Sequence, residues 1–503
     1  MRCCIVKGEI DISNKDPQYT SFRKNLSETL DALKKLTGNT SDLSVSEARL
    51  GGVRCAAAVI EGMASAQILS ETVLAPVMKQ AAGTEQTSES LFEILTVSTL
   101  LTPDRTLPKD LNEAASLLFA GFAVIFVDGI ESAAAFGVQG FDRKAVSEPS
   151  SEHNIMGSQE GFCEALRTNI SLVRRRMKTP SLRFETLSLG SETKTDIALA
   201  YLSDRAESGL VRRLRRRLKE VGLDAVLASG SVKPFLEQGS DKWLFSEVSA
   251  TERPDVVCAK LNEGRAAVLI DGTPFALVCP SLFVENFRTV DDTCSKPYFV
   301  VLMRIIRFIA FFFAVMFPGI YVAVANYHPE MLTLKLLLNL TASERSTPYS
   351  LFVEMLIITV LLELMKEASV RMPRAVGSAI SIAGGLVIGD AAVKSGIISS
   401  PLLIIVGLTA TASFVIPGLA QQSSVLRLVY IAAGGAAGFF GIAVVSGMIM
   451  TNAAAMNEYG ISYTAPLLPF SRAGAADILG RRSAERLAAE HTTVSDYKGV
   501  PDE

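Results

Sequence analysis

The chain has few of the side chains that enzymes use to bind metals or to activate a nucleophile. It contains three histidines, and no two of them lie close together in the sequence. Its seven cysteines include no Cys-x-x-Cys pair, and there is no P-loop, no His-Glu-x-x-His and no Gly-x-Ser-x-Gly motif. We therefore expect no catalytic residue, no metal site and no bound cofactor, and an enzyme is the least favoured class.

The N-terminus lacks a secretory signal, because residues 1–9 contain no apolar core of about seven to fifteen residues. An odd number of cysteines without paired spacing is typical of reduced thiols in the cytoplasm. Charged residues occur at ordinary density over residues 1–297. We expect this large N-terminal region to be cytoplasmic. The net charge of −3 gives no reason to predict a nucleic-acid partner.

Charge is missing from long stretches of the C-terminal region. Phe308–Ala325 is 18 residues without a charge, and Leu428–Asn457 is 30. A helix rises ~1.5 Å per residue, so about 20 apolar residues cross the roughly 30 Å hydrocarbon core of a bilayer. The sequence predicts an α-helical polytopic membrane domain over residues 298–460, with four to six helices, and a cytoplasmic tail over 461–503.

Two signals recur in the N-terminal region at nearly the same offset. The apolar run 123–127 leads into Asp128-Gly129, and a similar run leads into Asp271-Gly272, 143 residues later. Such a pair favours a hairpin, because glycine accepts positive φ. We predict an α/β region built from two related lobes. The predicted segments are a polar lead and helix over 1–40, a first lobe over 41–141, a linking segment over 142–189 and a second lobe over 190–297.

The linking segment carries a basic run, Arg174, Arg175 and Arg176. A run of this kind is usually the solvated face of a helix. Two functional alternatives are a contact with anionic lipid headgroups and a contact with acidic residues of a partner.

The direction of the membrane helices is predicted from charge, because positive loops stay in the cytoplasm. Arg304 and Arg307 precede the first apolar stretch and Arg371 follows the second, so the first span runs outward and the second returns. Arginines in the tail place the C-terminus inside as well, which requires an even number of crossings. The apolar stretches are 308–325, 351–365, 375–398, 401–420 and 428–451. Either the third is broken or re-entrant, or the fifth is split at Gly434-Gly435.

The third stretch contains an ionisable residue, Asp390. A charge at the bilayer centre costs about 2.5–3.5 kcal/mol, so such a residue tends to face protein or a watery cavity. Ser378, Ser381, Gly385 and Gly389 recur beside it at helical steps. This small polar stripe either packs against a neighbouring helix or lines a pore.

The second stretch carries two carboxylates, Glu354 and Glu363, nine residues apart and so on opposite sides of a helix. This helix is not a plain lipid-facing span. Either protein surrounds it on both sides, or it lies partly in the interface with Glu363 and Glu367 toward water. We expect Glu354 and Glu363 to contact the membrane or a partner.

Short blocks along the chain match a known family in order. They include Glu-Gly-Phe at 160–162, Leu-Val-Arg-Arg-Arg at 172–176, Thr-Glu-Arg-Pro-Asp at 251–255, Asp-Gly-Thr-Pro at 271–274, the segments 304–325 and 371–388, and Ser-Phe-Val-Ile-Pro at 413–417. On these residues the chain resembles the A-subunit family of spore germinant receptors, the GerA family, which also includes the stage V sporulation protein AF relative.

The resemblance implies a subunit of a nutrient receptor in the spore inner membrane, a multi-pass cell membrane protein that triggers spore germination. It implies a permease-like B subunit and a lipoprotein C subunit as partners, contact with membrane lipid, and a homo-oligomer around a cation channel. The pore-lining interpretation of Asp390 and its stripe rests on this resemblance. The alternative function is a non-conducting accessory or scaffold membrane protein, as would suit the stage V relative.

Overall fold

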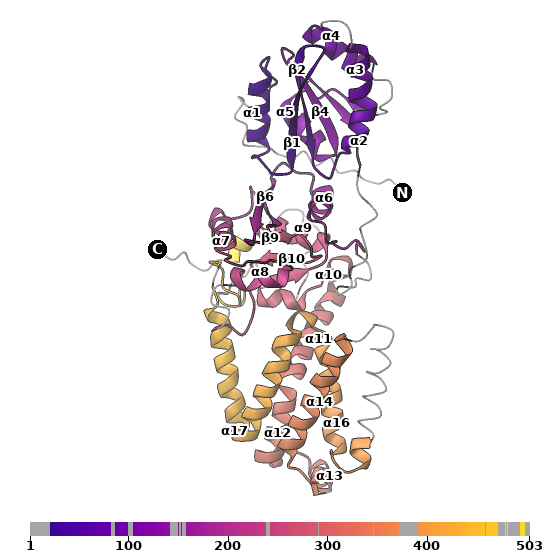
Figure 1. Cartoon of the computed structure of the whole chain (residues 1–503). Helices are drawn as coiled ribbons and strands as arrows, with labels where there is room; N and C mark the ends of the chain where they lie inside the picture. The colour runs from indigo at the N-terminus through magenta and orange to yellow at the C-terminus, as the bar shows by residue number, and fades with distance from the viewer. Residues whose placement is uncertain are drawn as a thin grey trace. The chain divides into compact units, whose positions relative to one another are not determined.

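The computed structural model describes residues 21–81, 86–98, 104–140, 149, 152, 157–237, 242–289, 291–345, 347–371, 391–457, 459–470, 478, 480 and 493–497 (Figure 1). The chain divides into two units. The first runs to Leu236 and also takes up Ala250–Pro280 and Thr492–Ser495. The second consists of Glu237–Ser249, Ser281–His491 and Asp496–Glu503.

The first unit begins with a lobe in which helices cover an antiparallel sheet. Its helical elements are α1 (Leu26–Leu36), α2 (Ala66–Leu69), η2 (Ser70–Leu74), α3 (Ala75–Ala81), α4 (Ser88–Glu93), η3 (Ile94–Ser98) and α5 (Leu111–Phe119). Its strands are β1 (Leu43–Leu50), β2 (Val53–Ile60), β3 (Arg105–Thr106), β4 (Phe122–Val127) and β5 (Ala133–Gly137). They pair in the order β1-β2-β4-β5-β3, and each pair is antiparallel.

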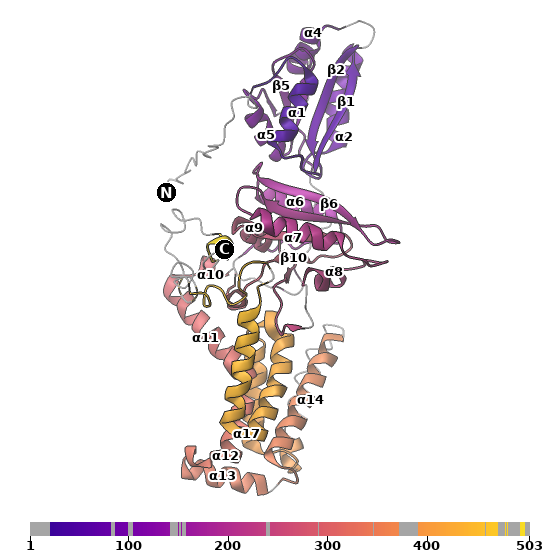
Figure 2. The ribbon, with the colours of Figure 1, turned by 90° about the vertical axis from the view of Figure 1, so that its left-hand side faces the viewer.

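Both faces of this sheet are buried, which explains why β4 and β5 are apolar throughout. Successive side chains of a strand point to opposite faces. On one face, Ala56 and Val124 pack against α1 and α5, which lie together in Figure 2. On the other face, Cys55 and Ile125 pack against α2, α3 and α4. The lobe is therefore a sheet between two layers of helices.

The second lobe repeats this order of elements. Its helices are α6 (Leu166–Arg176), α7 (Ser208–Lys219), α8 (Ser229–Leu236) and α9 (Pro254–Asn262). Its strands are β6 (Leu182–Leu189), β7 (Thr195–Leu202), β8 (Ser249–Thr251), β9 (Ala266–Ile270) and β10 (Ala276–Cys279). They are ordered β6-β7-β9-β10-β8, the same topology as the first sheet.

The repeated Asp-Gly pairs have equivalent roles in the two lobes. Each follows a central strand and opens the connection to the antiparallel strand beside it. The glycines, Gly129 and Gly272, have φ of +88° and +80°. The aspartates bind the first turn of a helix: Asp128 accepts from Leu26 N at 3.0 Å, and Asp271 accepts from Leu166 N at 2.9 Å.

These helix contacts move the lobe boundaries away from the predicted ones. Helix α6 and strand β6 fall in the predicted linking segment, yet both belong to the second lobe. Helix α1 falls in the predicted lead and belongs to the first. Boundaries at 41 and 190 separate each lobe from the helix that its own hairpin turn binds.

The second unit is helical and apolar. Its elements are η5 (Phe283–Phe287), α10 (Asp291–Cys294), α11 (Pro297–Val315), α12 (Phe317–Tyr327), η6 (Pro329–Met331), α13 (Leu334–Arg345), α14 (Leu351–Arg371), α16 (Ser400–Ser413), η7 (Pro417–Leu419) and α17 (Ala420–Ala455). The short η8 (Val494–Tyr497) begins in the first unit and ends in the second. Within the described residues, two helices are long and apolar enough to cross a membrane: Pro297–Val315, with 19 residues, and Pro417–Ala455, with 39.

Helix α17 is folded back on itself. Ala437 and Gly438 leave helical geometry, and Gly438 has φ of +60°. Tyr430 and Ser446 are 16 residues apart, yet their hydroxyls are within 3.0 Å. In a straight helix about 24 Å would separate them. The fifth apolar stretch is therefore two antiparallel arms, as one of the two sequence alternatives has it, although the break lies at 437–438 instead of Gly434-Gly435 (Figure 1).

Prolines shorten two of the other predicted spans. The stretch 308–325 is divided between α11 and α12 just before Pro318, which cannot donate to the carbonyl four residues earlier. The stretch 401–420 ends as a helix at Ser413, because Pro417 has no N–H to donate to the carbonyl oxygen of that residue, and Ile416 before it leaves helical geometry with φ of −130° and ψ of 75°. With 14 residues, α16 is about 21 Å long. The third stretch, 375–398, lies mostly outside the described residues.

Candidate functional site

The two lobes meet at Arg174, on α6. Its side chain has no exposed surface, and Asp42 of the first lobe binds it with two hydrogen bonds of 3.0 and 3.1 Å. Its remaining Nη1 group donates to the carbonyl oxygens of Thr179 and Leu182. The basic run therefore begins with a residue that joins the lobes. The hypothesis that Arg174 meets lipid or a partner does not fit this burial.

Arg175 and Arg176 point to a second carboxylate, Glu160. Their guanidinium groups lie 2.8 and 2.7 Å from its two oxygens. Burial alone raises the pKa of Glu160, but hydrogen bonds and charge from the two arginines outweigh it and hold the pKa below its ordinary value. Both arginines keep part of their surface exposed, so a further contact with lipid or a partner stays a prediction for them.

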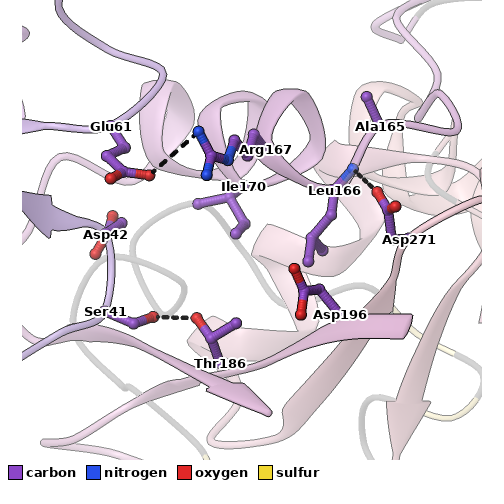
Figure 3. Close-up of a pocket in the computed structure, with 10 residues that line it drawn as sticks. All are labelled: Ser41, Asp42, Glu61, Ala165, Leu166, Arg167, Ile170, Thr186, Asp196 and Asp271. Atoms are coloured by element: carbon purple, nitrogen blue, oxygen red, sulfur yellow. Dashed lines mark hydrogen bonds and ion pairs between the residues drawn. The ribbon is translucent and has the colours of Figure 1, made fainter. Parts of the chain in front are cut away.

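A cavity of about 430 Å³ lies between the two lobes (Figure 3). On one side Arg167 lies 4.0 Å from Glu61, and on the other Ser41 and Thr186 are joined by a hydrogen bond. Two of its carboxylates are already bound, Asp42 by Arg174 and Asp271 by the first turn of α6. The cavity therefore offers a solute few unbound polar groups, and we assign it no ligand.

In the second unit, Asp292 forms ion pairs with Arg304 and Arg307 of α11. It accepts from Arg304 Nε at 3.0 Å and from Arg307 Nη1 at 2.9 Å. Arg304 Nη1 also donates to the carbonyl oxygens of Ile478 and Gly480 in the tail. Both arginines precede the apolar stretch 308–325, and the helix α11 that contains them begins earlier than that stretch, at Pro297. Both pair with the carboxylate of Asp292, so the three side chains together carry one positive charge instead of two.

Acid should weaken this contact. Burial by itself raises the pKa of Asp292, but hydrogen bonds and charge from Arg307 and Arg304 outweigh it, so the pKa lies below its ordinary value of 3.8. A carboxylate with a lowered folded-state pKa stabilises the fold above the unfolded-state value, and this contribution is lost as the pH falls through the folded-state pKa.

We expect Asp292→Asn to remove about 1.5–3 kcal/mol of stability at neutral pH, since it replaces a charged acceptor of two guanidinium groups. The difference from the wild type should shrink as the pH falls below 3.8. Thermal unfolding of the full chain in detergent, followed against pH, measures this. Glu220→Gln, in an exposed pair, is the control and should change little. A wild-type advantage that is constant from neutral pH down to pH 3 would contradict the assignment.

The helices of the second unit are joined by a cluster of charges that we call the Glu363 cluster: Glu363 and Lys366 of α14, and Ser424 and Arg427 of α17. Glu363 accepts from Arg427 at 2.8 Å, from Ser424 at 2.9 Å and from Lys366 at 3.3 Å. Lys366 also contacts Ser413, the last residue of α16. Arg427 is buried, with 1% of its surface exposed.

Arg427 also explains how the kink between α11 and α12 is stabilised. Pro318 has no N–H, so the carbonyl oxygen of Ala314, four residues earlier, has no helical donor. Arg427 Nε donates to that oxygen at 2.8 Å. The cluster therefore contacts α11, α14, α16 and α17 together. In the sequence, Arg427 is a single arginine between the apolar stretches 401–420 and 428–451, and this isolated charge was the signal for a site.

Glu354, nearer the start of α14, is fully buried. Its Oε2 accepts from the backbone N–H of Ser399 at 3.1 Å, where α16 begins. Glu354 and Glu363 thus both contact protein, the first of the two sequence alternatives for this helix. Glu367, by contrast, is exposed and pairs with Arg371. Within the described residues, no group of three or more His, Cys, Asp or Glu side chains could hold a metal ion.

A comparison with known families identifies the chain. The model of the family described as Bacillus/Clostridium GerA spore germination protein matches residues 31–492. The chain belongs to the GerA family.

Several relatives of this GerA-family chain carry names that fit the assignment. Spore germination protein KA of Bacillus subtilis (strain 168) is 36% identical over 473 residues, which cover 92% of this chain and 84% of that protein. Spore germination protein B1 of the same strain is 31% identical, over 88% of this chain and 92% of that protein. A third relative from that strain, the uncharacterized membrane protein YfkQ, is 34% identical, over 93% and 91%.

One solved structure is also similar to the chain. It is the crystal structure of the N-terminal domain of the A subunit of the Bacillus megaterium spore germinant receptor GerK3, with 30% sequence identity and a TM-score of 0.42. The match covers 52% of this GerA-family chain and 97% of that structure.

The pore residues predicted for this GerA-family chain are not located by the structure. Ser378, Ser381, Gly385, Gly389 and Asp390 all lie outside the described residues, so their place in an ion path stays a prediction. Glu354 and Glu363 are located, in two different protein environments. The residues that sequence analysis missed are their partners, Arg427, Ser424 and Ser399.

Proposed function

We propose that this GerA-family chain is the A subunit of a nutrient germinant receptor, and that copies of it surround a nutrient-gated cation channel. A permease-like B subunit binds the nutrient, and a lipoprotein C subunit completes the receptor. Binding of the nutrient shifts the helical unit from a closed to an open state, and monovalent cations leave the spore core.

The observation that carries this proposal is the Glu363 cluster inside an apolar helical unit. A helix that only anchors a protein in the membrane does not need a buried charged residue, because each such residue costs about 2.5–3.5 kcal/mol of insertion free energy near the bilayer centre. Ionisable residues in such positions commonly serve ion pathways and gates. Because the cluster binds four helices at once, a change at one helix reaches the others through ion pairs and hydrogen bonds.

Exposed apolar side chains support a membrane position for this unit. Phe299 and Ile309 on α11 are 44% and 48% exposed, and Phe440 and Met448 on α17 are 75% and 68% exposed. Large apolar side chains at this exposure favour contact with lipid or with neighbouring copies over contact with water. We place the chain in the spore inner membrane as a multi-pass protein.

The tail supports an even number of crossings. Val494, near the end of the chain, donates to the carbonyl oxygen of Glu263 in the second lobe at 2.8 Å. The chain therefore returns to the side of the lobes after its helical unit. The break of α17 at 437–438 supplies one more crossing than its length alone suggests, and we propose that its two arms cross in opposite directions.

Cation flux through the reconstituted receptor tests the proposal. The chain, the permease-like subunit and the lipoprotein are placed together in liposomes loaded with potassium, and the standard amino acids and simple sugars are added one at a time. At least one nutrient should raise potassium efflux about tenfold, as expected for a moderate coupling between sites. Liposomes without the chain should not respond.

Two variants refine this test. Asp390→Ala, in the predicted ion path, should reduce the nutrient-dependent flux, whereas Glu367→Gln, an exposed residue of α14, should leave it unchanged. The amount of each variant in the liposomes is compared by immunoblot. If no nutrient produced flux while the three proteins still assembled, the channel would be excluded and a non-conducting scaffold would be the better interpretation.

A further inference from the structure

Three of the buried polar atoms in the second unit that have no hydrogen-bond partner in the described part of the chain belong to α12, to α14 and to the residue before α16. They are Glu354 Oε1, Ser399 Oγ and Tyr321 OH. Glu354 is 0% exposed and Ser399 3% exposed. A buried donor or acceptor without a partner costs about 1–3 kcal/mol, and more when it is charged. A bound ion or molecule that contacts these three atoms, which come from three different segments, would remove this cost.

The three residues belong to one region of the second unit. Glu354 Oε2 accepts from Ser399 N at 3.1 Å, so these two residues are in direct contact. Tyr321, on α12, packs against the hydrophobic cluster that contains Met355 and Ile398. These are the residues adjacent to Glu354 and Ser399 in sequence. Glu354 is also close enough to act electrostatically on the Tyr321 hydroxyl.

No lysine, arginine or histidine in the described ranges forms an ion pair with Glu354. Glu344, on α13, adds a second carboxylate that interacts electrostatically with it. The N-terminus of α16 supplies one N–H and a favourable dipole, but these bind only one carboxylate oxygen. A buried carboxylate with no counter-ion takes up a cation or a proton.

We propose that Glu354, Ser399 and Tyr321 form a binding site for a monovalent alkali cation. One carboxylate and two hydroxyls are hard oxygen ligands, which suit alkali and alkaline-earth ions. Among the three proposed ligands Glu354 is the one carboxylate, and it balances a single positive charge. The choice of an alkali cation rests on the proposed function, whereas the need for an occupant rests on the unpartnered atoms alone.

The site is tested on the purified full chain in detergent. Its melting temperature is measured in potassium, sodium or N-methylglucamine chloride at equal ionic strength, together with equilibrium binding of radioactive rubidium. For the wild type we expect a melting temperature several degrees higher in an alkali salt, and saturable rubidium binding. Glu354→Gln should abolish both effects, and Glu367→Gln on the same helix should keep both.

Ser399→Ala and Tyr321→Phe keep the test decisive if Glu354→Gln does not fold. Each removes one hydroxyl and should raise the cation concentration for half-saturation about 3- to 10-fold. The site is overturned if the wild type does not respond to the identity of the cation, or if it responds only to pH, which would assign the carboxylate a proton. Cation binding without nutrient-dependent flux would exclude the channel and support the cation site. Flux without rubidium binding would exclude the cation site and support the channel.

Discussion

Arg174→Met should lower the free energy of unfolding of the first unit by about 3–5 kcal/mol, because it leaves the carboxylate of Asp42 buried without its partner. Asp42 is 3% exposed and its other contact is the hydroxyl of Thr40. The guanidinium also stacks on Phe119 of the first lobe and Phe184 of the second, at 4.7 and 5.0 Å from the ring centres. The substitution therefore weakens the contact between the lobes as well as the ion pair.

Arg175→Met is the matched control for this experiment. The two residues are adjacent on α6, but Arg175 pairs with a partly exposed carboxylate, so its loss should cost about 0–1 kcal/mol. Urea unfolding of the full chain, followed by a probe in the first unit, measures both. The double variant Arg174→Met with Asp42→Leu should recover part of the loss, since no charge stays buried alone. Equal effects of the two single variants would contradict the role of Arg174.

Gly434→Ala should lower the stability of the second unit about as much as Arg174→Met lowers that of the first, because it prevents α12 and α17 from packing. A Cβ atom at Gly434 would lie 2.3 Å from the carbonyl oxygen of Gly319, and one at Gly319 would lie 2.4 Å from that of Tyr430. Both obstacles are backbone atoms, so no side-chain rotation relieves the clash. We expect a cost of about 3 kcal/mol or more, because the two helix backbones must separate. The fraction of monomeric, folded chain extracted in detergent is the measurement.

Gly447→Ala is the control for this change. Gly447 is also in α17, and a Cβ there meets nothing within 4 Å. Alanine has the higher helix propensity by about 1 kcal/mol, so this variant should be neutral or slightly more stable. If Gly447→Ala and Gly434→Ala gave the same yield of folded chain, close backbone packing at Gly434 would not be what holds α12 against α17.

The class of the protein and its repeated design could be predicted from the sequence. Charge-free runs identify apolar helices because burying a charge in lipid is so costly that its absence is informative. The pair of Asp-Gly turns identified the two lobes because glycine at positive φ is required locally, whatever the chain does elsewhere. Family membership followed from short blocks in order, and the comparison with the family model confirmed it.

Contacts between distant segments could not be predicted in this way. Arg174, Arg175 and Arg176 look equivalent in sequence, but only the first is buried, since only it faces Asp42 132 residues earlier. Arg427 looks like the end of an apolar run, but the kink at Pro318 exposes a carbonyl that it binds.

The sequence by itself determined which segments are apolar, where the chain must turn, and to which family it belongs, because these properties depend on local composition. Only the tertiary structure decided which charges are buried, that α17 folds back at Gly438, and that no basic side chain among the described residues pairs with Glu354. The reason is that the cost of a buried charge depends on which groups of distant segments surround it.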